Sequence, residues 1–325
     1  MTSLTDSFVT MSNEEYHGHH ALGSSDVRRL MISPLHYKGR EEPSVRPPHF
    51  TFGSAVHAAY LEPEKFLTEY RAKPAEVEGQ GPRTKAYKEW MDAQPPVEWM
   101  KQEDYDKALK VVDSAFGHPI SGELFDNEVV VEGSLFFKMN GVECKARPDL
   151  VSISSEGHVD LLDLKTTTDA SSDAFRKTVG SFGYWIQEWF YRKAMREAGY
   201  KVRRFIFLCV EKTAPYACAA YVLNQADVDA AEELVATALK AYKGANDNDD
   251  WIGYPKEIAE ISVPPWVMPS SNSEPNGNWL TVKQAMEAFA VSRTTLYNWM
   301  ARGVESKRFG GKRFVSARSV GAMGK

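Results

Sequence analysis

The sequence predicts an α/β or α+β protein that carries a second, much smaller domain at its C-terminal end. The order of its segments predicts the main domain, because helices precede a set of antiparallel strands, which a helix and a further strand follow. The stretch VPPWVMPSSNSEPNG, residues 263–277, is rich in proline, serine and asparagine and is typical of a linker. We therefore expect one domain over residues 1–262 and another over residues 278–325.

The first half of the larger domain should contain three helices, over residues 24–31, 53–63 and 103–116. The segment SSDVRRLM begins with Ser24, and serine is a residue type that caps helix starts by accepting a backbone hydrogen bond. Pro63 should end the second helix, because proline lacks the N–H group that a helix interior needs.

The second half changes to short apolar runs separated by polar turns, which is typical of strands. We expect these strands to form a sheet that helices flank. In chain order the expected elements are strands over 128–137, 141–153 and 159–166, a helix over 183–198, strands over 202–210 and 216–223, and a closing helix over 225–243.

The composition is that of an ordinary globular protein. Of the 325 residues 43% are hydrophobic and 26% charged, and no run approaches the roughly 18–20 apolar residues of a membrane span. The N-terminus lacks the basic and apolar regions of a signal peptide. Three cysteines follow no metal-ligand spacing and cannot all pair. We therefore expect a cytoplasmic protein with reduced thiols and no membrane partner.

The charge is divided unequally along the chain. Residues 278–325 contain nine Lys and Arg residues and two Glu residues, which gives a net charge of +7. The preceding 277 residues contain thirty basic and forty-two acidic residues, a net charge of −12. A basic segment behind an acidic body indicates two modules with different partners.

An acid and a base interrupt the apolar strand VDLLDLKTT. Residues two apart in a strand point to the same face, so Asp163 and Lys165 lie side by side. If the preceding hairpin turns at Glu156, Asp149 of the previous strand lies directly opposite Asp163. Opposed side chains are about 4.5–5.5 Å apart at Cβ. The sequence therefore predicts two neighbouring carboxylates with an ammonium group beside them.

Two carboxylates at that separation repel each other unless a proton or a cation lies between them. Their oxygens suit Mg²⁺, which needs only one or two carboxylates plus waters and phosphate oxygens. A cation held there lowers the pKa of a bound water, and Lys165 would orient that water or neutralise charge on the phosphoryl group. The group indicates metal-dependent phosphodiester cleavage. The alternative is a partly exposed Asp–Lys ion pair without catalytic role.

Five segments in order give the chain its resemblance to a known family. The sequence resembles the PD-(D/E)-x-K nuclease superfamily, and specifically the RecE-type, exonuclease VIII-like phage exonucleases, over roughly residues 14–245. This resemblance implies a restriction-endonuclease-like core with a mixed sheet. The matching segments are GSSDVRRLMISPLHY (23–37), FGSAVHAAYLEP (52–63), KARPDLV (145–151), LLDLKTTTDAS (161–171) and GYWIQEWFY (183–191).

The resemblance implies a metal site and a catalytic lysine. Asp149, Asp163, the Leu164 carbonyl and His57 would bind Mg²⁺, with Mn²⁺ as a substitute, and Lys165 would be the catalytic lysine. Gly53 lies four residues before His57 on the same helical face, where a small residue permits close approach of the helix.

Other residues are candidates for contacts with DNA. Gln187 and Tyr191 fit a Q-x-x-x-Y motif and would touch the DNA backbone or brace Lys165, although Tyr191 suits core packing nearly as well. Arg147 would pair with Asp149 or reach a phosphate, and Glu132 is a weaker candidate for supporting the site. In the family the segment with Arg28 and Arg29 lies near the place where DNA enters, whereas the alternative is a helix with two solvated arginines.

The basic tail resembles the winged helix–turn–helix of excisionase and MerR-type regulators. Thr281 and Ser292 should cap two short helices, and Gly310-Gly311 should join two strands. Ala290 stands where such turns commonly carry glycine. The alternative is a basic module that docks on protein. DNA would be contacted by the second helix through Arg293, Thr294, Thr295 and Asn298, and by the hairpin through Lys312 and Arg313.

The resemblance implies a Mg²⁺-dependent exonuclease that digests duplex DNA from its ends during phage-type recombination. It also implies a homo-oligomer, a phage single-strand annealing protein as a partner, and the bacterial host cytoplasm as the location if the gene is carried by a phage. Two other functions stay open. One is a site- or structure-specific endonuclease guided by the C-terminal module, and the other is an inactive DNA-binding scaffold for recombination.

Overall fold

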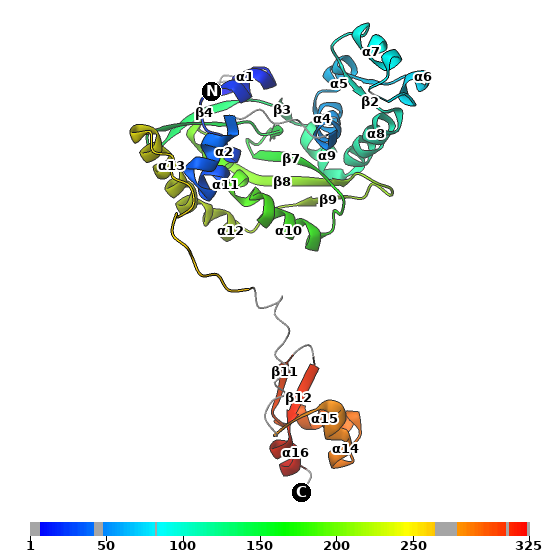
Figure 1. Ribbon diagram of the computed structural model, residues 1–325, viewed down its shortest axis with the longest axis vertical. Coiled ribbons are helices and arrows are strands. Elements are labelled where there is room, and N and C mark those ends of the chain that lie inside the picture. Colours follow the sequence, from blue (N-terminus) through cyan, green and yellow to red (C-terminus); the bar gives the residue numbers. More distant parts are fainter. Residues whose placement is uncertain (1–6, 42–47, 82, 264–277, 310–311, 324–325) are drawn as a thin grey trace. The chain divides into compact units, whose positions relative to one another are not determined.

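A five-stranded mixed sheet organises the larger part of the computed structural model (Figure 1). The structure describes residues 7–41, 48–81, 83–263, 278–309 and 312–323. The chain divides into two compact units, Met1–Tyr254 and Pro255–Lys325. Nearly all of the expected linker, residues 264–277, lies outside the described residues.

The sheet has the strand order β3-β6-β7-β8-β9. Only β7 and β8 run parallel, and the helices between them form the crossover that parallel neighbours require. The chain therefore has the mixed α/β architecture of a restriction-endonuclease-like fold. The strands are β3 (Glu128–Val131), β6 (Leu150–Ile153), β7 (Val159–Thr167), β8 (Val202–Glu211) and β9 (Cys218–Tyr221).

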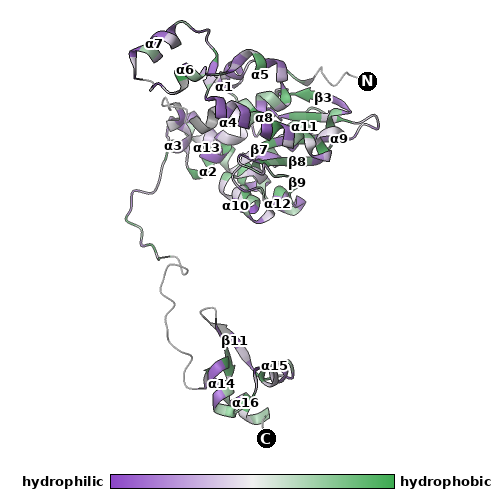
Figure 2. Cartoon of the chain, turned by 90° about the vertical axis from the view of Figure 1, so that its right-hand side faces the viewer, coloured by the Kyte–Doolittle hydropathy of each residue, from purple (hydrophilic) through white to green (hydrophobic). Residues whose placement is uncertain are grey.

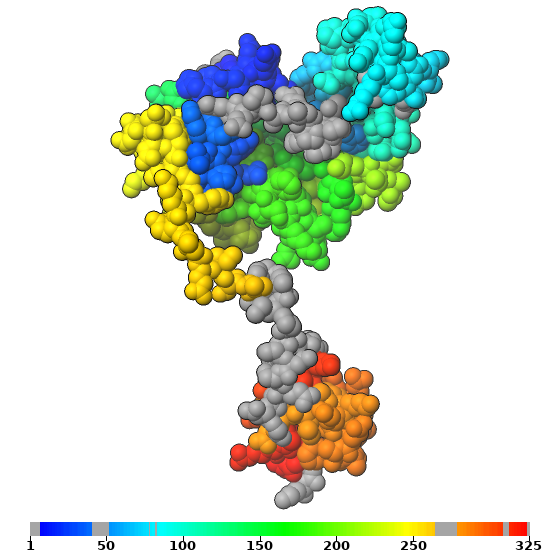
Figure 3. Space-filling model, viewed as in Figure 1, coloured from blue at the N-terminus to red at the C-terminus, as the bar shows by residue number. Residues whose placement is uncertain are grey.

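Helices cover both faces of this sheet, and each face has its own apolar core. Alternate residues of β7 enter different cores: Leu161 packs among residues of α2, α11 and α13, whereas Leu162 and Leu164 pack among residues of α4, α8 and α9. Figure 2 shows hydrophilic and hydrophobic segments alternating along these helices, as expected for helices with one face on the sheet. The segments of α2 and α13 also contact each other and adjoin at the surface (Figure 3).

The helices that carry or support the site described below come from distant parts of the sequence. The helices of this unit are α1 (Asn13–Gly18), α2 (Ser24–Ile32), α3 (Pro34–Lys38), α4 (Pro48–Leu61), α5 (Pro63–Glu69), α6 (Ala75–Glu78), α7 (Lys85–Asp92), α8 (Gln102–Gly117), α9 (Pro119–Phe125), α10 (Ser172–Phe182), α11 (Tyr184–Glu197), α12 (Gln225–Asp229) and α13 (Ala231–Asn248). Two small sheets pair β1 (Tyr70–Ala72) with β2 (Glu98–Met100) and β4 (Leu135–Met139) with β5 (Val142–Ala146).

Local details differ from the expectations at several places. The expected strand 141–153 is two strands, β5 and β6, which belong to different sheets. The expected strand 128–137 is two strands in different sheets, because Glu132 takes a left-handed φ of 50° and ends β3. Gly23, not Ser24, is the N-cap of α2, and its N–H donates to the Asp26 carboxylate at 3.0 Å. Pro63 begins helix α5 one residue after α4 has ended, a position that suits proline because the first N–H groups of a helix need no partner inside it.

In its described residues, the second unit has a small three-stranded sheet and three helices. Thr281 and Ser292 cap α14 and α15 as expected, accepting hydrogen bonds from the N–H groups of Gln284 and Thr295. The strand order is β10-β12-β11, so the expected hairpin gains a third strand, and Gly310-Gly311 lie outside the described residues. The elements are β10 (Trp279–Thr281), α14 (Val282–Phe289), α15 (Arg293–Ala301), β11 (Ser306–Phe309), β12 (Lys312–Ser316) and α16 (Ala317–Met323).

Among the described residues, none of the helices combines the length and the apolar character that crossing a bilayer requires.

Candidate active site

Three acidic residues form a row across neighbouring strands of the sheet. The pairing of β6 with β7 places Leu150 opposite Leu162, which confirms the register expected for the hairpin and sets Asp149 beside Asp163. On the other side, the N–H of Glu132 donates to the Asp149 carbonyl at 3.1 Å. Strand register thus sets Asp149 beside Asp163, and the backbone hydrogen bond just past the end of β3 adds Glu132 to the row.

Asp163 is buried and held from two sides. Its side chain is 1% exposed, and one of its carboxylate oxygens forms an ion pair with the ammonium of Lys165, two residues along β7. The other oxygen accepts a hydrogen bond of 2.6 Å from Nε2 of Gln187 on α11. Gln187 thus braces Asp163, the acid that pairs with Lys165, and not Lys165 itself.

Asp149 immediately precedes β6 and reaches the backbone of β7. Its Oδ2 accepts a hydrogen bond of 2.8 Å from the backbone N–H of Leu164 and stands 3.5 Å from Nδ1 of His57. Nε2 of His57 hydrogen-bonds the Leu164 carbonyl at 2.8 Å. Helix α4 therefore brings His57 to the same point of β7 that Asp149 reaches, although the two residues are far apart in sequence.

Glu132 lies closer to His57 and Asp149 than the sequence indicated. Ligand atoms of His57, Glu132 and Asp149 lie within 4.8 Å of one another, the one group of three such side chains found in the part of the chain that the structure describes. Asp163 stands outside that group. The left-handed φ of Glu132 was the missing signal, since strand periodicity gives no indication of such a kink.

The ionisation of the acids and of the lysine at this site is shifted by burial and by the neighbouring charges. Burial together with the Asp163 carboxylate raises the pKa of Asp149 to about 6. Burial together with Asp149 raises the pKa of Glu132 to about 8. Burial alone would lower the pKa of Lys165, but the carboxylates of Asp163 and Asp149 raise it above its ordinary value. Lys165 therefore stays charged while the acids resist ionisation.

The side chain of Arg147 points to the N-terminal segment of the chain. Its side chain is buried over the ring of Tyr16, with the guanidinium carbon 4.1 Å from the ring centroid. Nε donates to Ser134 Oγ at 2.8 Å, Nη1 to Asn13 Oδ1 at 2.8 Å and Nη2 to the Met11 carbonyl at 3.1 Å. These contacts use the guanidinium to fix the N-terminal segment, and neither expected role, pairing with Asp149 or reaching a phosphate, matches them.

The packing around Tyr191 and Gly53 shows what each residue contacts. Tyr191 is buried with its ring 6.1 Å from that of Phe205, and burial raises its pKa well above the ordinary value. It therefore follows the alternative of core packing. A Cβ added to Gly53 would meet Thr166 Oγ1 at 3.7 Å, an ordinary contact, so the close approach of α4 to β7 does not require glycine there.

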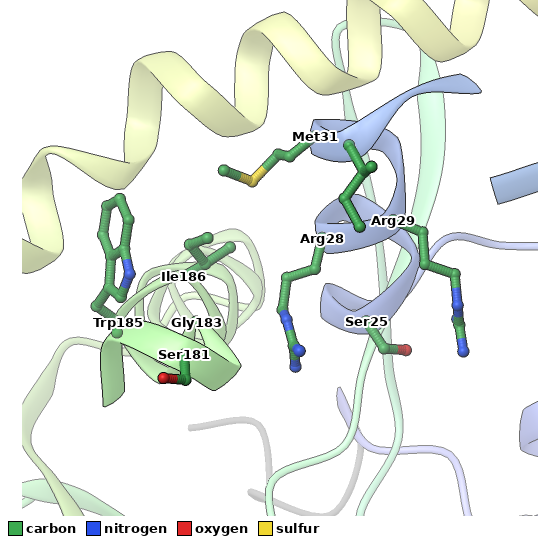
Figure 4. Close-up of a pocket in the computed structure, with 10 residues that line it drawn as sticks. Ser25, Arg28, Arg29, Met31, Ser181, Gly183, Trp185 and Ile186 are labelled. Carbon is green, nitrogen blue, oxygen red and sulfur yellow. The ribbon is translucent and has the colours of Figure 1, made fainter. Parts of the chain in front are cut away.

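A cavity of about 440 Å³ lies between α2 and the junction of α10 with α11 (Figure 4). The side chains of Arg28 and Arg29 line it together with Ser25, Ser181 and Ile186. Arg29 pairs with Asp26 at 3.3 Å. Both arginines thus line this cavity, Arg29 exposed to solvent and Arg28 half-buried.

The candidate DNA-binding residues of the second unit are mostly exposed. In α15 the side chains of Arg293, Thr294 and Asn298 face solvent, whereas Thr295 is half-buried and bonded to the capping residue Ser292. On β12, Lys312 is exposed, and Arg313 lies over the ring of Tyr297 at 5.7 Å.

Comparisons with known proteins found one family model and several solved structures that are similar to this chain. A family model described as a PDDEXK-like domain of unknown function (DUF3799) matches residues 24–261. A candidate exonuclease from Eubacterium rectale has 14% identity and a TM-score of 0.49, over 73% of this chain and 88% of its own. A phage-related exonuclease from Haemophilus somnus has 11% identity and a TM-score of 0.31, over 73% of this chain and 100% of its own. A search of curated proteins found no match.

Proposed function

Because this chain belongs to the family of PDDEXK-like domains, we propose that it is a metal-dependent nuclease that hydrolyses phosphodiester bonds in DNA. One observation carries the proposal: Asp149, Asp163 and Lys165 meet at a single point of the sheet, where His57 also arrives from helix α4. An ammonium group beside a cluster of acids suits the stabilisation of charge on a phosphoryl group.

The residues present fit a divalent cation. Carboxylate oxygens and one imidazole nitrogen converge within 4.8 Å, and the raised pKa values of Asp149 and Glu132 indicate that the surrounding protein by itself does not stabilise their ionised forms. Asp149, His57 and Glu132 would hold the ion, with an oxygen of Asp163 or the Leu164 carbonyl completing the set. Mg²⁺ suits the carboxylates, and Mn²⁺ suits the mixture with imidazole.

The residues of the site would each have a defined task in that reaction. A bound Mg²⁺ or Mn²⁺ would lower the pKa of a water and polarise the phosphate. Lys165, which stays protonated, would orient the attacking water or neutralise charge that develops on the phosphoryl oxygens. Gln187 holds Asp163 in the orientation that keeps Lys165 at the site.

We further propose that the substrate is duplex DNA attacked from its ends, in phage-type recombination. The resemblance of the five sequence segments to RecE-type exonucleases supports this choice. The same resemblance supports a homo-oligomer and a phage single-strand annealing protein as partner. The cavity at Arg28 and Arg29 would accept a backbone phosphate, because arginine side chains suit that ligand.

The basic second unit would supply DNA affinity that the acidic first unit lacks. The net charge of +7 over residues 278–325, the exposed Arg293, Thr294 and Asn298 of α15, and Lys312 of the hairpin favour binding to a groove and its phosphates. This arrangement also supports a second candidate, an endonuclease guided to its site by the second unit.

Digestion of two substrates separates the candidates. End-labelled linear duplex and covalently closed circular duplex are incubated with the protein and Mg²⁺, and products are followed over time. Progressive loss of the linear substrate with an intact circle is expected. Cutting of the circle without preference for ends would instead establish the endonuclease.

Replacing Lys165 by alanine tests whether the chain is an enzyme at all. We expect the variant to bind duplex with an unchanged Kd but to lose about 10²–10³-fold in turnover, the usual cost of removing one charge-stabilising donor. Lys110→Ala, on an exposed face of α8, is the matched control and should cut normally. If wild type and variant both leave the duplex intact with Mg²⁺ or Mn²⁺, the protein is an inactive scaffold.

A further inference from the structure

The aromatic face of Tyr184 lies against the ammonium group of Lys165. Nζ stands 4.6 Å from the ring centroid, within the distance at which the negative face of an aromatic ring attracts a cation. The same ammonium pairs with the carboxylate of Asp163. Lys165 is thus held from two directions, by an acid of its own strand and by a ring from helix α11.

The ring of Tyr184 is itself fixed in place. It stacks on Phe207 of β8 at a centroid distance of 5.6 Å and on Phe182 of α10 at 5.8 Å. Phe207 is the cross-strand neighbour of Asp163, so the sheet that positions the acid also positions the ring. Tyr184 follows Gly183, whose left-handed φ of 63° makes the sharp turn between α10 and α11.

One turn of α11 therefore contacts both members of the ion pair. Tyr184 and Gln187 are three residues apart, a spacing that puts them on the same helical face. Gln187 donates to the Asp163 carboxylate, and Tyr184 presents its ring to Lys165. We propose that Tyr184 is a positioning residue that holds the Lys165 ammonium at the point from which it acts on the phosphate, an inference that rests on the proposed nuclease function.

A ring suits this task in a way that a second acid would not. Lysine has a long, flexible side chain, and this one is 21% exposed, so packing alone does not fix its end. A further carboxylate would hold the ammonium but cancel its charge towards the phosphate. An uncharged ring attracts the ammonium and leaves its positive charge available to the substrate.

Three substitutions at position 184 test the proposal. Within the described residues the Tyr184 hydroxyl makes no hydrogen bond, so Tyr184→Phe keeps the contact and should retain turnover within about threefold. Tyr184→Leu and Tyr184→Met remove the ring, and Met keeps a side chain of similar length. We expect both to lower kcat by about tenfold, with KM changed less than twofold, because loss of a partly buried cation–π contact has that order of effect.

A second measurement detects the contact without any reaction. In protein labelled with ¹³C at lysine Cε, the ring current of Tyr184 shifts the proton resonances of the Lys165 methylene group upfield, and Lys165→Arg assigns the signal. The shift should persist in Tyr184→Phe and disappear in Tyr184→Leu and Tyr184→Met. Thermal melting of each variant checks that it is folded.

The outcomes separate this inference from the proposed function. If the wild type cuts DNA and the folded Leu and Met variants cut equally fast, or if Phe is as impaired as Leu, Tyr184 does not position Lys165. A Lys165 signal with no upfield shift in the wild type overturns the inference even if the protein cuts no DNA. Absence of cutting by the wild type with the shift present refutes the nuclease function and leaves the contact intact.

Discussion

At the scale of single residues, the ionisable side chains of the site shift one another's pKa values. Lys165 keeps its proton because Asp163 and Asp149 outweigh the effect of burial on its pKa. Asp149 and Glu132 resist losing theirs because both are half-buried close to other acids. Neutral contacts hold the charged groups in position, the amide of Gln187 on Asp163 being the clearest of them.

The contact between Gln187 and Asp163 predicts a particular kinetic defect. Gln187→Ala removes the donor from a buried carboxylate, and we expect turnover to fall by about tenfold, the size of one charge-assisted hydrogen bond. The Kd for duplex DNA should stay within twofold of wild type, because the amide points to Asp163 and not to solvent. Filter binding with the inactive Lys165→Ala protein as background measures it. A large loss of DNA affinity would assign Gln187 to the DNA backbone instead.

The raised pKa values predict how stability changes with pH when no divalent cation is present. Folded Asp149, with a pKa of about 6, and folded Glu132, with a pKa of about 8, keep protons that the unfolded chain releases near pH 4. The unfolded state therefore binds fewer protons, and the free energy of unfolding falls as pH rises through that window. We expect Tm, followed by circular dichroism, to fall by roughly 5 °C between about pH 5 and pH 8.

Added cation should reverse this trend. Mg²⁺ or Mn²⁺ binds the ionised carboxylates, so it should raise Tm more at about pH 8 than at about pH 5.5. Glu188, whose pKa burial raises to about 7, contributes to the slope without a cation but not to the cation effect. In the double variant Asp149→Asn with Glu132→Gln, the cation should no longer change Tm. An undiminished effect in that variant would place the ion elsewhere.

At the scale of elements, three strands and two helices deliver the site. Strand register and a backbone hydrogen bond form the acidic row, α4 brings His57 from one face of the sheet, and α11 brings Tyr184 and Gln187 from the other. The two apolar cores fix these helices against the sheet, so the precision of the site depends on packing far from it. In the second unit, the turn between α14 and α15 is strained at Ala290, whose φ is 50°.

That strain predicts a stabilising substitution. A left-handed conformation costs a residue with a Cβ about 1 kcal/mol that glycine avoids, so Ala290→Gly should stabilise the second unit by roughly 0.5–1 kcal/mol. Hydrogen exchange of the amides of α14 in the full chain should slow by about two- to fivefold. The matched control is Ala288→Gly, at an exposed position inside α14, which should accelerate exchange because glycine destabilises a helix interior.

At the scale of the whole molecule, charge separates the two units. A chain that lacks residues 278–325 loses a net charge of +7. We expect its affinity for duplex DNA to fall by at least tenfold and the dependence of Kd on salt to become shallower, because fewer phosphates are neutralised. Metal-dependent cutting at saturating DNA should persist. Titration of labelled duplex at several salt concentrations measures both quantities, and unchanged affinity would give the second unit another role.

The sequence by itself determined the order of the main elements, the hairpin register and the pair Asp163–Lys165. These are local properties, since periodicity, turn residues and a two-residue strand repeat depend only on neighbours in the chain. The caps of α14 and α15 are local for the same reason. The break of the expected strand 128–137 at Glu132 escaped this reasoning, because no local pattern signals a left-handed residue between two strands.

Only the tertiary structure decided which side chains meet. It turned Arg147 inward onto Ser134, placed Tyr191 in the core, joined Glu132 to His57 and Asp149, and laid the ring of Tyr184 on Lys165. Such contacts join segments that are tens of residues apart in the chain. They depend on how helices pack against a sheet, and packing is set by the whole core rather than by any one segment.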